Sequence, residues 1–158
     1  MRNVRFLLAA AAVALSTAGS PAQTDGCTET RLDDPPRQAW DCGGLLIEAE
    51  AGLAFGPGAV TAEEGAVLAE VPPGSGDFQI QTPHAIASVR GTVFVVDVGE
   101  HSTSVLVVEG VVEVARRDAS ETVTLAAGEG IDVAEGEPLA AQAWQPPRVA
   151  ALLARFGR

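Results

Sequence analysis

The chain has 158 residues, and its 21 acidic residues outnumber its 10 basic ones, giving a formal net charge of -11 at neutral pH. This length suits a single domain with one core. A surface this acidic repels nucleic-acid phosphates and anionic lipid headgroups, so we expect neither as a partner.

The N-terminus has the features of an export signal. Two arginines lie within residues 1–5, an apolar run covers residues 6–15, and the small residues Ser20 and Ala22 frame a cleavage site. We predict a signal-peptide helix over residues 1–22. A retained membrane anchor is the alternative, although the apolar run falls short of the about 20 residues that span a bilayer. The expected location is periplasmic or secreted, with no membrane span after cleavage.

A pair of cysteines follows the predicted cleavage site. Cys27 and Cys42 are separated by 14 residues, and such a pair in an exported protein indicates a disulfide. We expect residues 23–43 to form a disulfide-closed loop, because the segment has too little apolar matter to order itself. Trp40 should pack under the bridge, with an exposed recognition tryptophan as the alternative. Two thiols without a nearby histidine fall short of the usual four zinc ligands, so no metal site is predicted.

Residues 44–136 are predicted to form a β domain, because extended segments and turn signals recur about every ten residues. The expected strands cover 45–55, 66–71, 78–82, 84–90, 92–98, 103–109, 111–117, 121–127 and 130–135. Residues 99–102 would form a hairpin loop, and Glu109 with Gly110 a two-residue turn between antiparallel neighbours. This pattern indicates an all-β fold, either an antiparallel β-sandwich or a rolled β-solenoid.

Alternation along these segments predicts which side chains face the core. One face of the strand over residues 92–98 would carry Thr92, Phe94, Val96 and Val98. The inward residues of the later strands would be Val112, Val114, Val123, Leu125, Ile131 and Val133.

The tail over residues 137–158 changes character. Val149, Leu152 and Phe156 recur at helical spacing, and Pro147 suits the first turn of a helix. We predict one short amphipathic C-terminal helix. We expect it to cover an open end of the β core as a flap, and a helix that binds a partner is the alternative.

The segment over residues 77–133 resembles the FecR domain. The resemblance is carried by TPHAIASVRGTVFVVDV, TSVLVVEGVVEV and LAAGEG, which follow one another at family-like spacing. His84 and Ser88 stand where the family more often has small residues, and neither breaks the pattern. The resemblance implies a FecR-like β fold with a structural motif at residues 90–92 and 109–110.

Arg90, Gly91 and Thr92 form the centre of this motif. We expect the Arg90 guanidinium to bond backbone carbonyls or to pair with Asp97 or Glu109. Contact with a ligand, shared with His84, is the alternative. Gly91 and Thr92 would then set the backbone geometry.

The sequence offers little for catalysis. His84 and His101 are its two histidines, and no Gly-x-Ser-x-Gly elbow or calcium-loop pattern accompanies them. A Ser88–His84–Asp97 arrangement can be drawn, but many chains of this composition allow one. We predict that the protein is not an enzyme and has no cofactor.

The resemblance also implies a function. Well-known FecR proteins join a cytoplasmic anti-sigma segment, a transmembrane helix and a periplasmic FecR domain, whereas only about five residues precede the predicted signal's apolar run here. We therefore expect an exported module of the bacterial cell envelope, without the anti-sigma segment, that senses a signal or binds an envelope protein through an edge strand or a β face. The alternative is a glycan or small-ligand binding module, with a polar pocket near His84 and Arg90.

Overall fold

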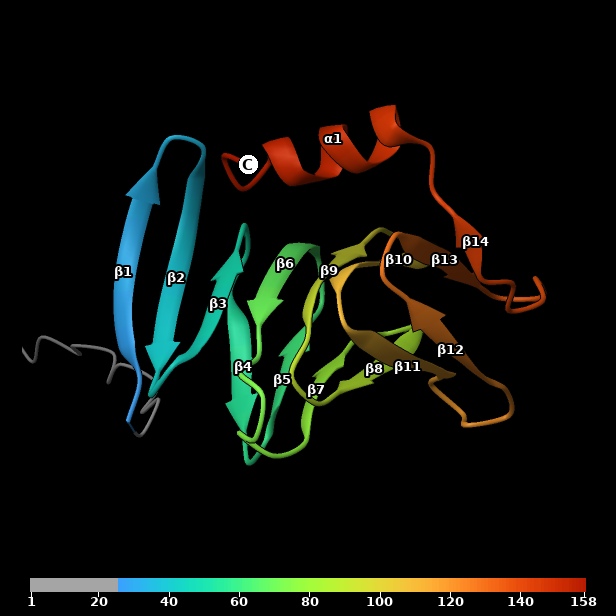
Figure 1. The fold of residues 1–158 in the computed structure, drawn as a ribbon, viewed down its shortest axis with the longest axis horizontal. Helices are drawn as coiled ribbons and strands as arrows, with labels where there is room; N and C mark the ends of the chain where they lie inside the picture. The colour runs from blue at the N-terminus through green and yellow to red at the C-terminus, as the bar shows by residue number, and fades with distance from the viewer. Residues whose placement is uncertain (1–25) are drawn as a thin grey trace, which may run out of the picture.

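The computed structural model describes residues 26–158, which form a two-layered β-sandwich with one helix outside it (Figure 1). The predicted signal peptide over residues 1–22 lies outside the described residues. The all-β prediction is confirmed, and of its two alternatives the sandwich is the correct one.

The two sheets differ in size. From edge to edge, the eight-stranded sheet contains β1 (Thr28–Asp33), β2 (Pro36–Cys42), β3 (Leu45–Ala49), β6 (Gly65–Glu70), β9 (Val93–Val98), β10 (Ser102–Glu109), β13 (Glu129–Ala134) and β14 (Gln142–Ala143). The six-stranded sheet contains β12 (Thr122–Ala126), β11 (Val111–Arg116), β8 (Ala85–Val89), β7 (Phe78–Gln81), β5 (Ala59–Ala62) and β4 (Leu53–Gly56).

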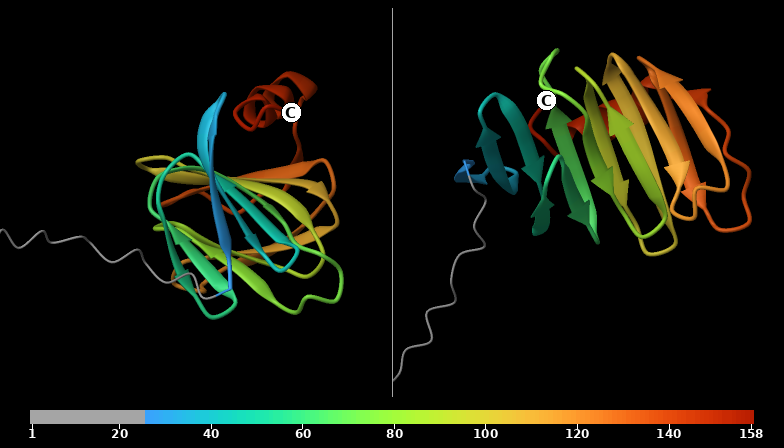
Figure 2. Two further views of the ribbon diagram at one scale, coloured as in Figure 1. Left: turned by 90° about the vertical axis from the view of Figure 1, so that its left-hand side faces the viewer. Right: turned by 90° about the horizontal axis from the view of Figure 1, so that it is seen from below.

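The chain changes sheet repeatedly. Hairpins such as β7–β8, β9–β10 and β11–β12 each stay within one sheet, and the connections between these hairpins cross to the other. Neighbouring strands are antiparallel except β5 and β7, which run parallel because β6 between them lies in the other sheet. The side view in Figure 2 separates the two layers.

The main core lies between the two sheets. Phe94, Val96 and Val98 of β9 point into it, as the alternation predicts. Val123, which was also predicted to face inward, is half-buried. The other five predicted inward residues are fully buried in this core: Val112, Val114, Leu125, Ile131 and Val133. The opposite face of β9 is covered as well, because Val95 belongs to a second apolar cluster beneath the helix.

The N-terminal segment differs from the predicted loop. The sequence predicts a disulfide-closed loop over residues 23–43, but in the described part of this segment β1 and β2 form an antiparallel hairpin at one edge of the eight-stranded sheet. Cys27 and Cys42 are disulfide-bonded beside the Thr28–Asp41 pair of this hairpin. The hairpin gains order because β2 pairs with β3 and buries Trp40 against Phe55, with ring centroids 5.3 Å apart. Trp40 is therefore a core residue and not an exposed recognition residue.

The single strand predicted over residues 45–55 is a second correction, because this segment forms two strands. β3 lies in the eight-stranded sheet and β4 in the six-stranded sheet, and the bend between them crosses the sandwich. The imperfect alternation of this segment reflects the change of sheet. β5 and β14 are further strands that the sequence pattern did not indicate.

The predicted C-terminal helix is confirmed as α1 (Pro146–Ala154). Its position differs from the expected flap over an open end. It lies outside the eight-stranded sheet, on the side away from the six-stranded sheet (Figure 2). Leu152 and Phe156 pack there because four outward side chains of the central strands are apolar: Ala66, Leu68, Val95 and Leu106.

Candidate functional site

Two crossings between the sheets bring the predicted motif together. Residues 90–92 connect β8 to β9, and Gly110 connects β10, which ends at Glu109, to β11. The two corners touch: the Thr92 Oγ1 hydroxyl donates to the Val111 carbonyl at 3.0 Å. Because Thr92 is only 2% exposed, this bond links the corners inside the protein.

Gly110 makes the contact between the corners close. Its φ is +90°, and a Cβ atom there would lie 2.9 Å from Thr92 Oγ1 and 3.0 Å from the Gly91 carbonyl oxygen. The predicted hairpin turn at Glu109 and Gly110 is wrong, because β10 and β11 lie in different sheets. The conformation that glycine permits redirects the chain across the sandwich.

Arg90 pairs with a carboxylate other than the two expected. Its Nε and Nη2 atoms donate to Asp77, the latter at 3.0 Å, whereas Asp97 pairs with Arg155. This hydrogen bonding lowers the pKa of the Asp77 carboxyl. Both side chains are exposed, so the pair contributes little to stability.

His84 lies far from Arg90. The two residues flank opposite ends of β8, roughly 20 Å apart along an extended chain. His84 Nδ1 lies 3.0 Å from Thr103 Oγ1, which is 2.8 Å from Thr82 Oγ1. These contacts link the β7–β8 turn to β10 in the other sheet, so the predicted His84–Arg90 ligand site is not formed.

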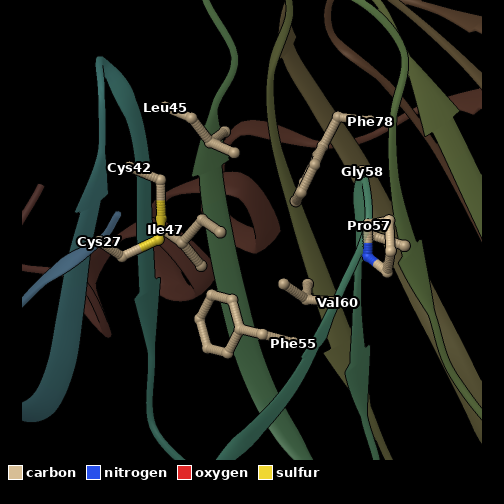
Figure 3. A pocket seen from close by; sticks show the side chains of 11 residues that line it. Cys27, Cys42, Leu45, Ile47, Phe55, Pro57, Gly58, Val60 and Phe78 are labelled. Carbon is tan, nitrogen blue, oxygen red and sulfur yellow. A yellow bond between two sulfur atoms is a disulfide. The ribbon is translucent and has the colours of Figure 1, made fainter. Parts of the chain in front are cut away.

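An apolar pocket of about 430 Å³ lies beside the disulfide (Figure 3). Its walls come from the ends of β2 and β3, the β4–β5 turn and the start of β7. Ile47, Phe55 and Val60 project into it, together with the Cys27–Cys42 bridge. Because its lining has no charged side chain, the pocket suits an apolar group better than a sugar.

The outer face of the eight-stranded sheet carries three rows of side chains that follow from the strand register. The first row contains Ala66, Asp97, Ser104 and Asp132. The second contains Glu48, Leu68, Val95, Leu106 and Gly130. The third contains Leu46, Glu70, Val93 and Glu109, with Val108 in the bulge of β10 next to it. We call Ala66, Leu68, Val95 and Leu106 the helix-contact face, because α1 packs on them.

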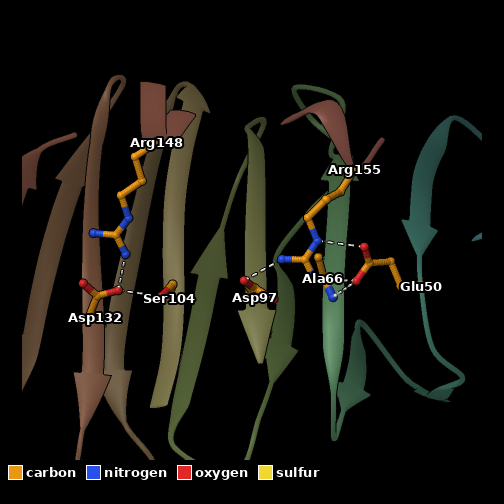
Figure 4. Close-up of polar contacts among 7 residues, drawn as sticks. All are labelled: Glu50, Ala66, Asp97, Ser104, Asp132, Arg148 and Arg155. Atoms are coloured by element: carbon orange, nitrogen blue, oxygen red, sulfur yellow. Dashed lines mark hydrogen bonds and ion pairs between the residues drawn. The ribbon is translucent and has the colours of Figure 1, made fainter. Parts of the chain in front are cut away.

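Arginines of the C-terminal segment meet the acidic groups around this face (Figure 4). Arg155 donates to Glu50 at 2.8 and 2.5 Å and to Asp97 at 2.7 Å. Arg148 donates at 2.6 Å to Asp132, which also accepts from the Ser104 hydroxyl.

Three further contacts hold the ends of this segment. Arg158 pairs with Glu70 and, at 3.2 Å, with Glu48. The Arg148 guanidinium carbon lies 3.5 Å from the ring centroid of Trp144, a cation–π geometry. The C-terminal segment is therefore attached by both apolar packing and ion pairs.

These ion pairs lower the pKa values of two of the carboxyl groups involved. The hydrogen bonds from Arg155 lower the pKa of Glu50 below its ordinary value of 4.5, although partial burial opposes the shift. Burial of Asp132 favours its neutral form, but hydrogen bonds from Arg148 and Ser104 outweigh burial and lower its pKa. Both carboxylates are charged at neutral pH.

Residues 26–158 hold no group of three or more His, Cys, Asp or Glu side chains arranged for a metal ion. Within the same range, no helix has the length and apolar character needed to cross a membrane.

This fold and the motif at its two corners are also found when the chain is compared with known proteins. Residues 54–113, from β4 to β11, match the family model described as FecR protein. We call residues 54–113 the FecR segment, because this is the part of the chain that the family model matches. The FecR segment contains both corners, so its RGT and EG residues act in this chain as contacts between two sheet crossings.

Solved structures share the fold. Two crystal structures, at 1.65 and 2.50 Å resolution, are described as a candidate anti-sigma factor from Parabacteroides distasonis. They give TM-scores of 0.58 and 0.53, each with 22% identity over 80% of this chain. The match spans 60% of those chains. No curated protein matches this chain.

Two features of the site escaped the sequence reasoning. The pocket combines residues from five separate strands, and no local pattern identifies such a set. The arginine contacts had a readable signal, because Arg148 and Arg155 are seven residues apart and share a helix face in a chain without lysine.

Proposed function

We propose that this protein is a non-catalytic protein-binding or signal-sensing module of the bacterial cell envelope. The observation that carries the proposal is the FecR-family segment at residues 54–113. The shared fold with structures described as a candidate anti-sigma factor supports a regulatory role. We propose an envelope protein as the partner.

An exposed edge of the larger sheet supports binding to another protein. Five of the six residues of β1 are exposed, and β1 has β2 as its one strand neighbour among the described residues. An unpaired edge offers backbone groups to an incoming strand. Glu29 and Arg31 alternate with polar residues along it, which disfavours indiscriminate pairing with other copies.

The proposed location is the periplasm or the medium. The apolar run near the N-terminus and the Cys27–Cys42 bridge support it, because disulfides persist in oxidising compartments. Fractionation of cells expressing the full chain with a C-terminal tag tests this. We expect tagged protein outside the cytoplasm with an N-terminus at Gln23 and an oxidised cysteine pair by mass spectrometry. Uncleaved, reduced protein in the cytoplasm would contradict the location.

The binding proposal is tested with the exported protein as bait in an envelope extract. We expect one envelope protein to be recovered at near-stoichiometric amount. An unrelated acidic β-sandwich of similar charge serves as the control bait. Equal recovery by both baits, or no recovery, would remove the proposal's support.

A second candidate function is binding of a small apolar ligand in the pocket beside the disulfide. Its size and uncharged lining favour this class. We expect an apolar fluorescent dye to bind the wild type and to lose binding in Ala59→Phe, which fills the pocket. Val108→Ala, at an exposed position outside the pocket lining, is the matched control. Equal dye binding by all three proteins would exclude the pocket.

A further inference from the structure

The helix-contact face is separate from the inter-sheet core. Its four residues point outward from β6, β9 and β10 and belong to a different apolar cluster from the inward residues of the same strands. The core between the sheets is therefore complete without α1. A displaced α1 would leave the sandwich folded and expose four apolar side chains on its outer face.

The contacts that hold α1 on the sheet are weak enough for another helix to replace it. The helix has nine residues, and Leu152 is its one buried residue. Helices this short are marginal in isolation. The Arg148 and Arg155 side chains are 43% and 36% exposed, so solvent and salt screen their ion pairs.

The same face continues beyond α1. Leu46 lies in the third row and Val108 in the β10 bulge beside that row. Each is 40% exposed, which makes them two of the three large exposed apolar residues of the described chain. A partner that covers this row would bury apolar surface that α1 leaves in water. That difference would favour the partner over α1.

Charge complementarity identifies the occupant. Acidic groups surround the helix-contact face at Glu48, Glu50, Glu70, Asp97 and Asp132. The occupant must carry cations at the spacing of Arg148 and Arg155 and an apolar stripe between them. An arginine-bearing amphipathic helix meets both requirements, because guanidinium groups bind carboxylates in a bidentate manner.

We propose that the outer face of the eight-stranded sheet binds an arginine-bearing amphipathic helix of a partner protein, in exchange for α1. This inference rests on the proposed protein-binding function and assigns it a surface and a partner chemistry. In the unbound protein, α1 occupies the partner's position.

A peptide with the sequence of residues 144–158 provides the probe. Its binding to the full chain is measured by fluorescence anisotropy. In the double variant Arg148→Glu and Arg155→Glu, α1 is repelled by the carboxylates while the sheet is unchanged. We expect this variant to bind the labelled peptide at least tenfold more tightly than the wild type does. A peptide with its arginines replaced by glutamate should not bind.

The control variant carries the same change of charge elsewhere. Arg31→Glu with Arg117→Glu alters two arginines outside α1 and should bind the peptide as the wild type does. If the Arg148 and Arg155 variant fails to fold, Leu152→Ala loosens α1 without a change of charge and should show the same gain. A folded variant with no gain would overturn the inference. A dimer that exchanges α1 between copies would overturn it too, since the occupant would then be a second copy.

The envelope pull-down separates this inference from the proposed function. We expect the Arg148 and Arg155 variant to recover more of the same partner than the wild type, and the peptide to compete for it. Equal recovery without competition would overturn the helix-exchange inference and leave protein binding intact. Recovery of no specific partner by either bait would count against both.

Discussion

Trp144 lies so close to Gly130 that a Cβ atom at position 130 would overlap the indole ring. Gly130 lies on β13, and Trp144 directly precedes the residues that enter α1. The strand therefore needs glycine here because the indole occupies the space of a side chain. The contact fixes the point at which the C-terminal segment turns back over the sheet.

Gly130→Ala should destabilise the protein by about 1–3 kcal/mol, because the added methyl group displaces Trp144 and loosens α1. Denaturant unfolding measures the loss, and tryptophan fluorescence reports the displacement. Gly52→Ala is the control, since a Cβ there meets no atom within 4 Å and Gly52 does not have a positive φ. In the Trp144→Ala background, Gly130→Ala should cost little. An undiminished cost in that background would contradict the proposed contact.

Gly110→Ala should be more damaging than Gly74→Ala, although both glycines have positive φ, of +90° and +80°. A Cβ at Gly74 meets open space, so that variant carries the backbone cost of about 1–2 kcal/mol alone. At Gly110 the clash with Thr92 adds about 1–3 kcal/mol. Thermal unfolding of the two variants compares them. Equal losses would mean that the corners are not in close contact.

Acid should weaken the attachment of α1. Arg155 lowers the folded-state pKa of Glu50, so this carboxylate stabilises the fold above its ordinary pKa of 4.5 and loses that contribution as the pH falls through the lower folded-state value. Asp132 acts in the same direction from its ordinary value of 3.8. We expect the free energy of unfolding to fall below about pH 4.5.

Glu50→Gln tests this assignment. The variant should be less stable than the wild type at neutral pH, and the difference should shrink as the pH falls below 4.5, the ordinary pKa of Glu50. Glu63→Gln, at an exposed loop position, is the matched control. Denaturant unfolding at several pH values provides the measurement. A Glu50→Gln deficit that stays constant down to pH 2 would exclude the ion pair as its cause.

Removal of the disulfide should destabilise the protein by about 3 kcal/mol, because the bridge closes a loop with a sequence separation of 15. Cys27→Ser with Cys42→Ser tests this in guanidinium unfolding. Hydrogen exchange should quicken in β1 and β2, while β9 in the sheet centre stays protected. Reductant should shift the wild type toward the variant and leave the variant unchanged. Uniform exchange in all strands would instead indicate that the hairpin is essential to the whole sandwich.

Local patterns predicted much of the β structure. The first four residues of β11 alternate between exposed and buried, because one face of the strand points toward the core. In β9 both faces are covered, yet Phe94, Val96 and Val98 still point into the main core as the period of two predicts. The segment over residues 45–55 was misread because β3 and β4 use different sheets within one apolar run. The N-terminal hairpin was missed because its order depends on β3 and Phe55, which lie outside it.

The sequence predicted less well which residues contact one another across the fold. Arg90 was expected to pair with Asp97 or Glu109, whereas the fold brings Asp77 beside it. The helix was predicted from its own residues, but its place on the outer face depends on apolar side chains of β6, β9 and β10. Such pairings join residues up to 110 positions apart, as Arg158 and Glu48 show.

The sequence by itself determined the all-β class, the FecR-family motif, most of the strands, the disulfide pair and the C-terminal helix. These features depend on periodicity, turn residues and residue type within short windows. Only the tertiary structure decided the strand order, the apolar pocket and the contact of α1 with the outer face. Each of these arises from side chains that meet across sheets or across long sequence separations, where local pattern carries no information about which surfaces come together.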